Sequence, residues 1–199
     1  AMESRGLGDV YKRQVLDFLS RVGRVPLPGY IRDGLARNED VERYQTVFAE
    51  RPGSAAAPTA GLHFTPALLE ELQRRGVQRA EVTLHVGIDT FRPISTKKID
   101  EHAMHSEWCA ISQETVAAIR RTQKLNQRVV AVGTTAVRSL ETAAQSGATE
   151  SFVGATDLFI RPGYSFRTVD CMLTNFHMPK TTLMVLVSAF AGHELIRHA

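Results

Sequence analysis

Apolar and polar positions along the chain fall into two periods, and the shorter period predicts strands. Residues 80–86 alternate strictly between apolar and polar side chains, as a half-buried strand does. We predict a second short strand over residues 107–111. Residues 129–132 are a continuous apolar run, typical of a strand buried on both faces. We predict further strands over residues 157–160 and 169–173, the latter as an edge strand.

The longer period predicts helices with recognisable ends. Thr65 stands where an N-cap belongs, Pro66 occupies the first turn and Gly76 follows the last. Ser112 caps the next helix in the same way. The helices expected on this basis lie near residues 15–19, 40–50, 66–75, 113–126, 134–147 and 181–196. Strands that alternate with helices predict an α/β domain with a largely parallel sheet and flanking helices.

The first residues do not share these periods. The chain begins with Ala1, and residues 1–14 show no apolar period. We therefore expect residues 1–14 to be a non-native or disordered leader and residues 15–199 to form the α/β domain.

Composition narrows the class of protein. The chain has 199 residues, of which 43% are hydrophobic and 23% charged, as in an ordinary globular domain. The net charge of +3 permits a nucleic-acid partner without requiring one. Two cysteines make no disulfide framework, which favours a cytoplasmic protein. The longest apolar run, residues 183–191, is about half of the roughly 20 residues that a bilayer requires, so we expect no membrane segment.

The junction around Gly133 is the first candidate binding site. An apolar strand runs into Gly133, Thr134 and Thr135, and a helix follows. Ligands of open α/β sheets bind at such strand ends, where free N–H groups of a helix meet anions. Arg138 lies one turn on and can clamp a carboxylate. The same pattern also fits an ordinary strand-to-helix turn with a solvated arginine.

The segment EHAMHSEWC is the second candidate. Glu101, His102, His105 and Glu107 place imidazoles beside carboxylates, a combination suited to proton transfer near neutral pH. His102 and His105 with Cys109 can alternatively be zinc ligands of a metal-dependent hydrolase, although their spacing matches no standard set. A polar loop that enters a strand is the structural alternative.

Further histidines and basic pairs complete the candidates. Asn175 and His177 precede the apolar C-terminal helix, and His63 and His85 lie in a loop and at a strand end. Each of these histidines alone also fits a purely structural role. Phosphate contacts would use the basic residues at 74–75, 97–98, 120–121 and 124, in addition to Arg161, Arg167 and Lys180. Solvated faces explain such charges equally well, and a non-catalytic RNA-binding module is a further alternative.

Six segments together resemble one enzyme family, S-adenosylmethionine:tRNA ribosyltransferase-isomerase of queuosine synthesis. They are APTAGLHFT, VTLHVGIDTFRP, EHAMHSEWC, VVAVGTTAVRSLETA, TDLFIRPGY and TNFHMPKTTLMVLVSAFAG. The resemblance runs in order from about Val15 to about Gly192. It implies that the chain is a fragment that lacks the N-terminal part and the C-terminal end of the family's enzymes. Its domain would be the C-terminal part of a larger α/β domain whose inserted β-barrel is mostly missing.

The resemblance also implies a reaction. The family transfers the ribosyl group of S-adenosylmethionine, a co-substrate, to 7-aminomethyl-7-deazaguanine at the wobble position of tRNA. The ribosyl group isomerises, epoxyqueuosine forms, and adenine and methionine leave. This implies a tRNA anticodon loop as partner, a monomeric cytoplasmic enzyme and no metal.

The reaction sets requirements that residues of this chain can meet. A base must remove a proton beside the sulfonium, and we expect it among Glu101, His102, His105, Glu107, His85 and His177. Phe91 or Trp108 would face the cation, and Arg138 would hold the methionine carboxylate. We expect the remaining substrate contacts from Gly133, Thr134, Thr135, Asn175 and His63. Asp89 departs from the family, which usually has glycine there, and this lowers the activity expected of the chain.

Overall fold

The computed structural model describes residues 14–15, 17–19, 21–50, 52–87, 93–96 and 98–198. The expectations for Phe91, Asp89 and Lys97, and for all of the leader except Gln14, lie outside the described residues. The chain divides into two units, residues 1–44 and residues 45–199. The domain boundary expected after residue 14 stays a prediction.

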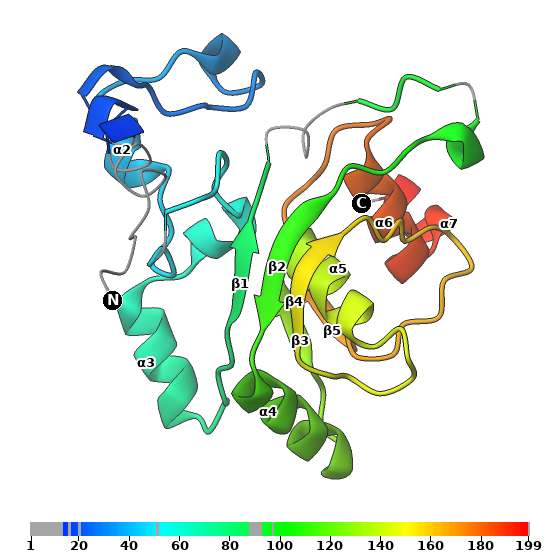
Figure 1. Ribbon diagram of the computed structural model, residues 1–199. Coiled ribbons are helices and arrows are strands. Elements are labelled where there is room, and N and C mark those ends of the chain that lie inside the picture. The colour runs from blue at the N-terminus through cyan, green and yellow to red at the C-terminus, as the bar shows by residue number, and fades with distance from the viewer. Residues whose placement is uncertain are drawn as a thin grey trace, which may run out of the picture. The chain divides into compact units, whose positions relative to one another are not determined.

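The first unit contains little regular structure. Helical residues occur at 14–15, 17–19 and 21–22, where the sequence predicted a short helix. A turn of 3-10 helix follows at Arg32–Gly34, and α2 spans Asp40–Arg43 (Figure 1). The longer helix predicted over residues 40–50 is wrong, because the chain leaves helical geometry at Tyr44. The β-branched residues Thr46 and Val47 then disfavour a continuing helix.

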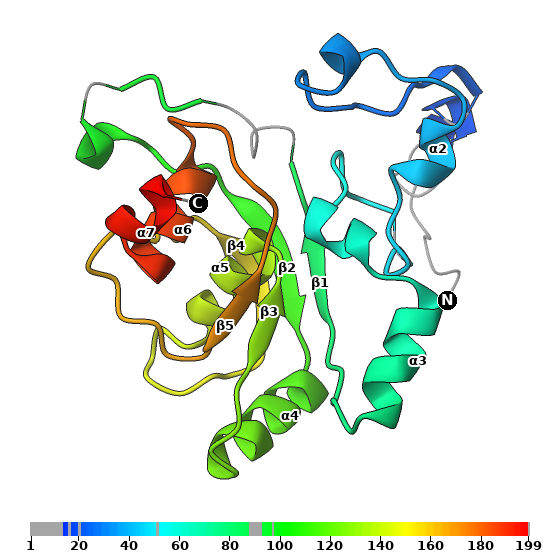
Figure 2. The ribbon, with the colours of Figure 1, turned by 180° about the vertical axis from the view of Figure 1, so that it is seen from behind.

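The second unit holds the strands, in two separate pairings. β1 (Val82–His85), β2 (Glu107–Ile111) and β4 (Phe152–Thr156) form an antiparallel sheet in the order β1-β2-β4. His85 lies opposite Trp108 in this register, and Glu107 lies opposite Thr156. β3 (Val130–Val132) and β5 (Cys171–Leu173) pair in parallel, as Figure 2 shows from behind.

A mixture of helices and strands is thus confirmed, but a largely parallel sheet is not. Among the described strands, only β3 and β5 run parallel. Parallel neighbours need a crossover, usually a helix, and α5 (Thr134–Ala143) supplies one between β3 and β5. The described part of the β1–β2 connection contains only the short turn Ile99–Glu101, so these strands meet antiparallel.

The capped helices lie close to where the sequence placed them. Thr65 accepts a hydrogen bond from Leu68 N at the start of α3 (Pro66–Arg74). Ser112 accepts one from Thr115 N at the start of α4 (Gln113–Lys124). The single helix predicted over residues 181–196 is wrong. It is interrupted at Gly192, whose φ of 85° separates α6 (Thr182–Ala191) from α7 (His193–Arg197).

Two strand predictions also need correction. The strand predicted at residues 157–160 is wrong, because β4 ends at Thr156. Residues 129–132 were expected to be buried on both faces, yet Val130 is 58% exposed. β3 pairs with β5 alone in the described sheets, so it is an edge strand there and not a central one. None of the helices in the described part of the chain is long and apolar enough to cross a membrane.

The core of the second unit forms around α5. This helix contacts all three strands of the antiparallel sheet as well as β3 and α6 (Figure 1). Its inward side chains Val137 and Leu140 pack with Ile111 of β2 and Leu186 of α6. Four apolar side chains in and just after this helix are buried: Ala136, Val137, Leu140 and Ala144.

The strand directions bring distant segments to one edge. β1 and β4 end and β2 begins at the same edge of the antiparallel sheet, the upper edge in Figure 1. We call this the site edge. α4 follows β2 and therefore lies at the opposite edge. Parallel pairing also brings the end of β5 beside the end of β3, where α5 begins.

Candidate functional site

A buried arginine joins α5 to the site edge. Arg138 is only 2% exposed, and its Nη1 lies 2.6 Å from Oε2 of Glu107, which is also 2% exposed. Nη1 also lies 3.3 Å from Nε2 of His105. Nη2 donates to the carbonyl oxygens of His105 and Thr156, and Nε donates to that of Leu158. The guanidinium thus ties together the start of β2 and the end of β4.

These contacts change the role expected of Arg138. A guanidinium has five N–H donors, and the five contacts account for all of them. In this geometry the guanidinium has no N–H left over for a substrate carboxylate, and the carboxylate-binding role expected of Arg138 stays a prediction. Burial lowers the pKa of Arg138 and the charge of Glu107 opposes that shift. The arginine positions Glu107 and His105 instead.

The contact with Arg138 fixes the form of His105. An arginine can only donate, so Nε2 of His105 is the acceptor and the ring proton resides on Nδ1. Oε1 of Glu107 lies 3.7 Å from the same Nε2. The structure therefore brings together three predicted site residues, His105, Glu107 and Arg138.

The junction at Gly133 has the predicted turn. Gly133 has a φ of 92°, a left-handed value that favours glycine, and its N–H donates to the carbonyl oxygen of Leu173 at 2.9 Å. Thr134 and Thr135 begin α5 and are buried. Whether this helix start binds an anion stays a prediction.

Two predicted binding residues from distant segments meet here. His63 ends the 3-10 turn Thr59–His63, and its Nε2 lies 2.6 Å from Oδ1 of Asn175, just beyond β5. Since the amide oxygen only accepts, Nε2 of His63 is the donor in this contact. Two residues on, Nε2 of His177 lies 3.0 Å from the hydroxyl of Thr174. Burial lowers the pKa of His177 from 6.5, which favours the neutral ring.

His85 and Trp108 stack across the first strand pair. Their ring centroids are 4.7 Å apart at an interplanar angle of 33°. Gly53 packs on the same imidazole, and a Cβ at Gly53 would lie 2.6 Å from a ring carbon of His85. One face of Trp108 is thus covered by His85.

The remaining candidates of EHAMHSEWC contact the loop after β4. The ring of His102 meets that of Phe159 edge-on at 5.6 Å. Arg161 lies over the same ring and pairs with Asp100. Glu101 ends the short turn Ile99–Glu101 and is exposed.

The zinc alternative finds no assembled site. Within the described ranges, no three His, Cys, Asp or Glu side chains gather as metal ligands. Cys109 is fully buried, and this burial raises the pKa of its thiol, which disfavours the thiolate that a metal would need.

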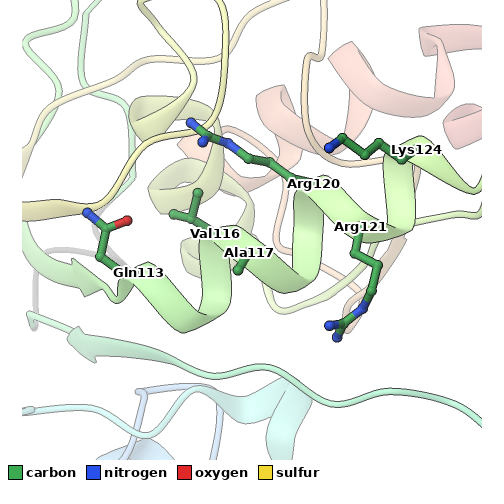
Figure 3. A pocket seen from close by; sticks show the side chains of 6 residues that line it. All are labelled: Gln113, Val116, Ala117, Arg120, Arg121 and Lys124. Atoms are coloured by element: carbon green, nitrogen blue, oxygen red, sulfur yellow. The ribbon is translucent and has the colours of Figure 1, made fainter.

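A basic hollow lies along α4, away from the site edge. It is lined by Gln113, Val116, Ala117, Arg120, Arg121 and Lys124 (Figure 3). Arg120 and Lys124 project from one side of the helix and Arg121 from the other. Arg120 donates to the carbonyl oxygen of Thr149, and Arg121 donates to the amide oxygen of Gln78.

Comparison with known proteins decides the family. The family model described as "Queuosine biosynthesis protein" matches residues 2–199. The chain belongs to this family. The S-adenosylmethionine:tRNA ribosyltransferase-isomerase of Thiobacillus denitrificans is 56% identical over 185 residues, which are 93% of this chain and 54% of that protein. The enzyme of the same name from Thermotoga maritima is 52% identical over 177 residues, covering 89% of this chain and 52% of the relative.

A solved structure of a family member has the same fold in its matching part. The crystal structure of S-adenosylmethionine tRNA ribosyltransferase from Thermotoga maritima matches with a TM-score of 0.57 and 47% identity. The match covers 70% of this chain and 44% of that structure. The chain spans about half the length of the curated relatives that it matches.

Sequence reasoning missed three residues that shape this queuosine-family chain. Glu141 of α5 is fully buried, and its carboxylate accepts from the backbone N–H groups of Arg167, Thr168 and Val169. Its position was a usable signal, because a residue three positions after Arg138 shares a face of this apolar helix. A charge on a buried face needs partners, which points to a structural role. The hydrophobic pattern predicts neither the packing of Gly53 on His85 nor the exposure of the Phe176 ring.

Proposed function

We propose that the chain carries catalytic residues of an S-adenosylmethionine-dependent tRNA ribosyltransferase-isomerase. The enzyme moves the ribosyl group of S-adenosylmethionine onto 7-aminomethyl-7-deazaguanine at the tRNA wobble position. The group rearranges to an epoxycyclopentanediol, so that epoxyqueuosine forms and adenine and methionine leave. Family membership supports this proposal, and so do the names of the relatives that match most of the chain.

One observation carries the proposal to particular residues. Three imidazoles from segments far apart in the sequence are each held by a specific partner. His105 contacts Arg138, His63 contacts Asn175 across 112 positions, and His177 contacts Thr174. Oriented imidazoles are the groups that proton transfer at neutral pH requires.

The chemistry needs a base that is neutral before the reaction. The sulfonium of S-adenosylmethionine acidifies the adjacent ribose carbon, and a base takes the proton from that carbon. His177 suits this role best, because burial favours its neutral form and a hydroxyl orients its ring. Arg138 holds His105 and Glu107 in a fixed arrangement, and these two residues are the next candidates for proton transfer. Glu101, His102 and His85 remain proposed participants in the proton transfers.

The other substrate groups need binding sites of different character. The ring of Trp108, together with Phe91, would meet the sulfonium cation. Gly133, Thr134 and Thr135 at the start of α5 would meet a substrate anion. Asn175 and His63 would contact the heterocycle.

Its partner would be the anticodon loop of a tRNA, whose unpaired wobble base can be splayed into a site. The basic residues along α4 would contact phosphates of the same RNA. We further propose a monomeric, cytoplasmic enzyme that needs no metal. The chain would form part of a larger α/β domain, and the inserted β-barrel would correspond to segments of the relatives that it does not match.

Adenine release tests the proposal. The full chain is compared with a chimera in which the matched segment of the Thiobacillus denitrificans relative is replaced by this chain. Both are incubated with S-adenosylmethionine and tRNA that bears the deazaguanine. We expect the chimera to release adenine only when this tRNA is present, and the chain alone to do so weakly or not at all. A chimera that binds the tRNA but releases no adenine would support a non-catalytic RNA-binding module and refute the proposal.

A further inference from the structure

The ring of Phe176 stands outside an otherwise well-held loop. It is 93% exposed, more than any other large hydrophobic side chain in the described part of the chain. Its two neighbours are fixed, Asn175 by His63 at 2.6 Å and His177 by Thr174 at 3.0 Å. The backbone is thus held on both sides of a phenyl ring that the described residues leave almost fully exposed. A single exposed apolar residue is ordinary, but one presented by two fixed neighbours beside a candidate site is not.

The groups beside this ring are those that a nucleobase needs. Oδ1 of Asn175 accepts from His63, so its amide nitrogen keeps two N–H donors that no described residue engages. Such donors match the acceptors on a base edge. Lys180, four residues after Phe176, is exposed, and residues 174–180 include no acidic side chain that would repel a phosphate.

We propose that Phe176 is a stacking surface for an unpaired base of the RNA substrate, with Asn175 donating to the edge of that base. This deepens the proposed function and rests on it. Proteins that recognise single-stranded RNA stack splayed bases on aromatic side chains in this way.

The exposure of the ring favours RNA over the adenine of S-adenosylmethionine. Small ligands are held in concave sites that bury about 70–90% of their surface. A ring that is 93% exposed lines no such concavity. A base that belongs to a folded RNA is held by contacts elsewhere along the polymer, so one open aromatic face suffices for it.

The test uses the full chain and an anticodon stem-loop RNA with the fluorescent base 2-aminopurine at the wobble position. Stacking quenches this fluorescence, and a titration gives the affinity. We expect Phe176→Ala to abolish the quenching and weaken binding about 5- to 150-fold, as the loss of one base–aromatic stack does. Phe176→Trp should retain both. Val153→Ala, at an exposed site on β4, is the matched control and should change neither.

The outcomes separate this inference from the proposed function. Equal binding and quenching by Phe176→Ala and the unsubstituted chain would overturn the inference, as would a lack of RNA binding by the unsubstituted chain. A Phe176→Ala chain that loses affinity for S-adenosylmethionine but not for RNA would also overturn it. Quenching that depends on Phe176 in a chimera that releases no adenine would uphold the stack while refuting the enzymatic proposal.

Discussion

Nη1 of Arg138 lies 2.6 Å from Oε2 of Glu107, and both side chains are almost completely buried. The two residues are 31 positions apart and join the first turns of α5 to the first residue of β2. Removing two charges from water is costly, so such a pair adds little net stability. Losing one partner, however, leaves the other charge buried and alone. The pair therefore fixes the arrangement of the site more than it stabilises the fold.

The first prediction concerns this pair. Arg138→Met should lower the free energy of unfolding by about 3–5 kcal/mol, because Glu107 is then buried without a counter-charge. The double variant Arg138→Met with Glu107→Gln removes both charges and should recover part of the loss. Urea denaturation of the three proteins measures both effects. An Arg138→Met chain as stable as the unsubstituted one would contradict the role given to the pair.

A second prediction concerns Glu141 on the same helix. Its carboxylate accepts three consecutive backbone N–H bonds, from Arg167, Thr168 and Val169. Glu141→Gln keeps the shape but turns one acceptor into a donor that faces an N–H group. The free energy of unfolding should fall by roughly 1–3 kcal/mol, the usual cost of an unsatisfied buried group.

The matched control for Glu141 is Tyr164→Phe. The tyrosine hydroxyl donates to the same carboxylate at 3.2 Å, and burial and the charge of Glu141 raise the pKa of Tyr164 to about 12. Its loss removes one peripheral hydrogen bond, so the control should be the more stable of the two variants. The reverse order in a denaturant titration would show that Glu141 does not hold the loop.

Local signals in the sequence predicted much of this fold. Thr65 and Ser112 cap their helices as expected, because a side-chain oxygen and the N–H three residues on are set by local geometry alone. The largely parallel sheet was predicted from the alternation of strands and helices, but β2 and β4 pair antiparallel although α4 and α5 lie between them, so that alternation alone does not determine strand direction. The strand predicted over residues 157–160 was wrong. Ile160 belongs to the core, so its apolar side chain indicates burial and not strand geometry.

The candidate site, like the fold, could be predicted from the sequence only in part. Residue type and spacing indicated His105, Glu107 and Arg138, and the structure brings them together. The role of Arg138 could not be predicted, because its partners include three backbone carbonyls that no side-chain pattern reports. His63 and Asn175 meet only through the tertiary fold.

A third prediction follows from the burial of His177. The folded-state pKa lies below the 6.5 of an exposed histidine, so the unfolded chain binds more protons between these two values. The contribution to stability is complete above pH 6.5 and is lost as the pH falls through the folded pKa. His177→Gln should therefore make the stability less sensitive to acid over this window. Denaturant titrations across it measure the slope, and an identical slope in both proteins would count against a buried neutral ring.

A fourth prediction concerns RNA binding along α4. Lys124→Gln should weaken binding of the anticodon stem-loop at low salt and reduce the slope of log affinity against log salt by about 1, as the loss of one phosphate contact does. Arg74→Gln is the control with the same change in charge, because Arg74 on α3 is already paired with Glu71. Equal slopes for the two variants would show that the α4 hollow does not contact phosphate.

The proposed function assigns the ribosyl transfer to His177, which lies beyond β5, and to His105 and Glu107 at the site edge. The decisive measurement is the mass of the wobble nucleoside after the chimera has acted on tRNA bearing 7-aminomethyl-7-deazaguanine. We expect epoxyqueuosine from the chimera and from its Val153→Ala control, and a large loss of product from His177→Ala in a protein that still folds and binds the tRNA. Unmodified deazaguanine from the chimera, or full product from the His177→Ala chimera, would refute this assignment.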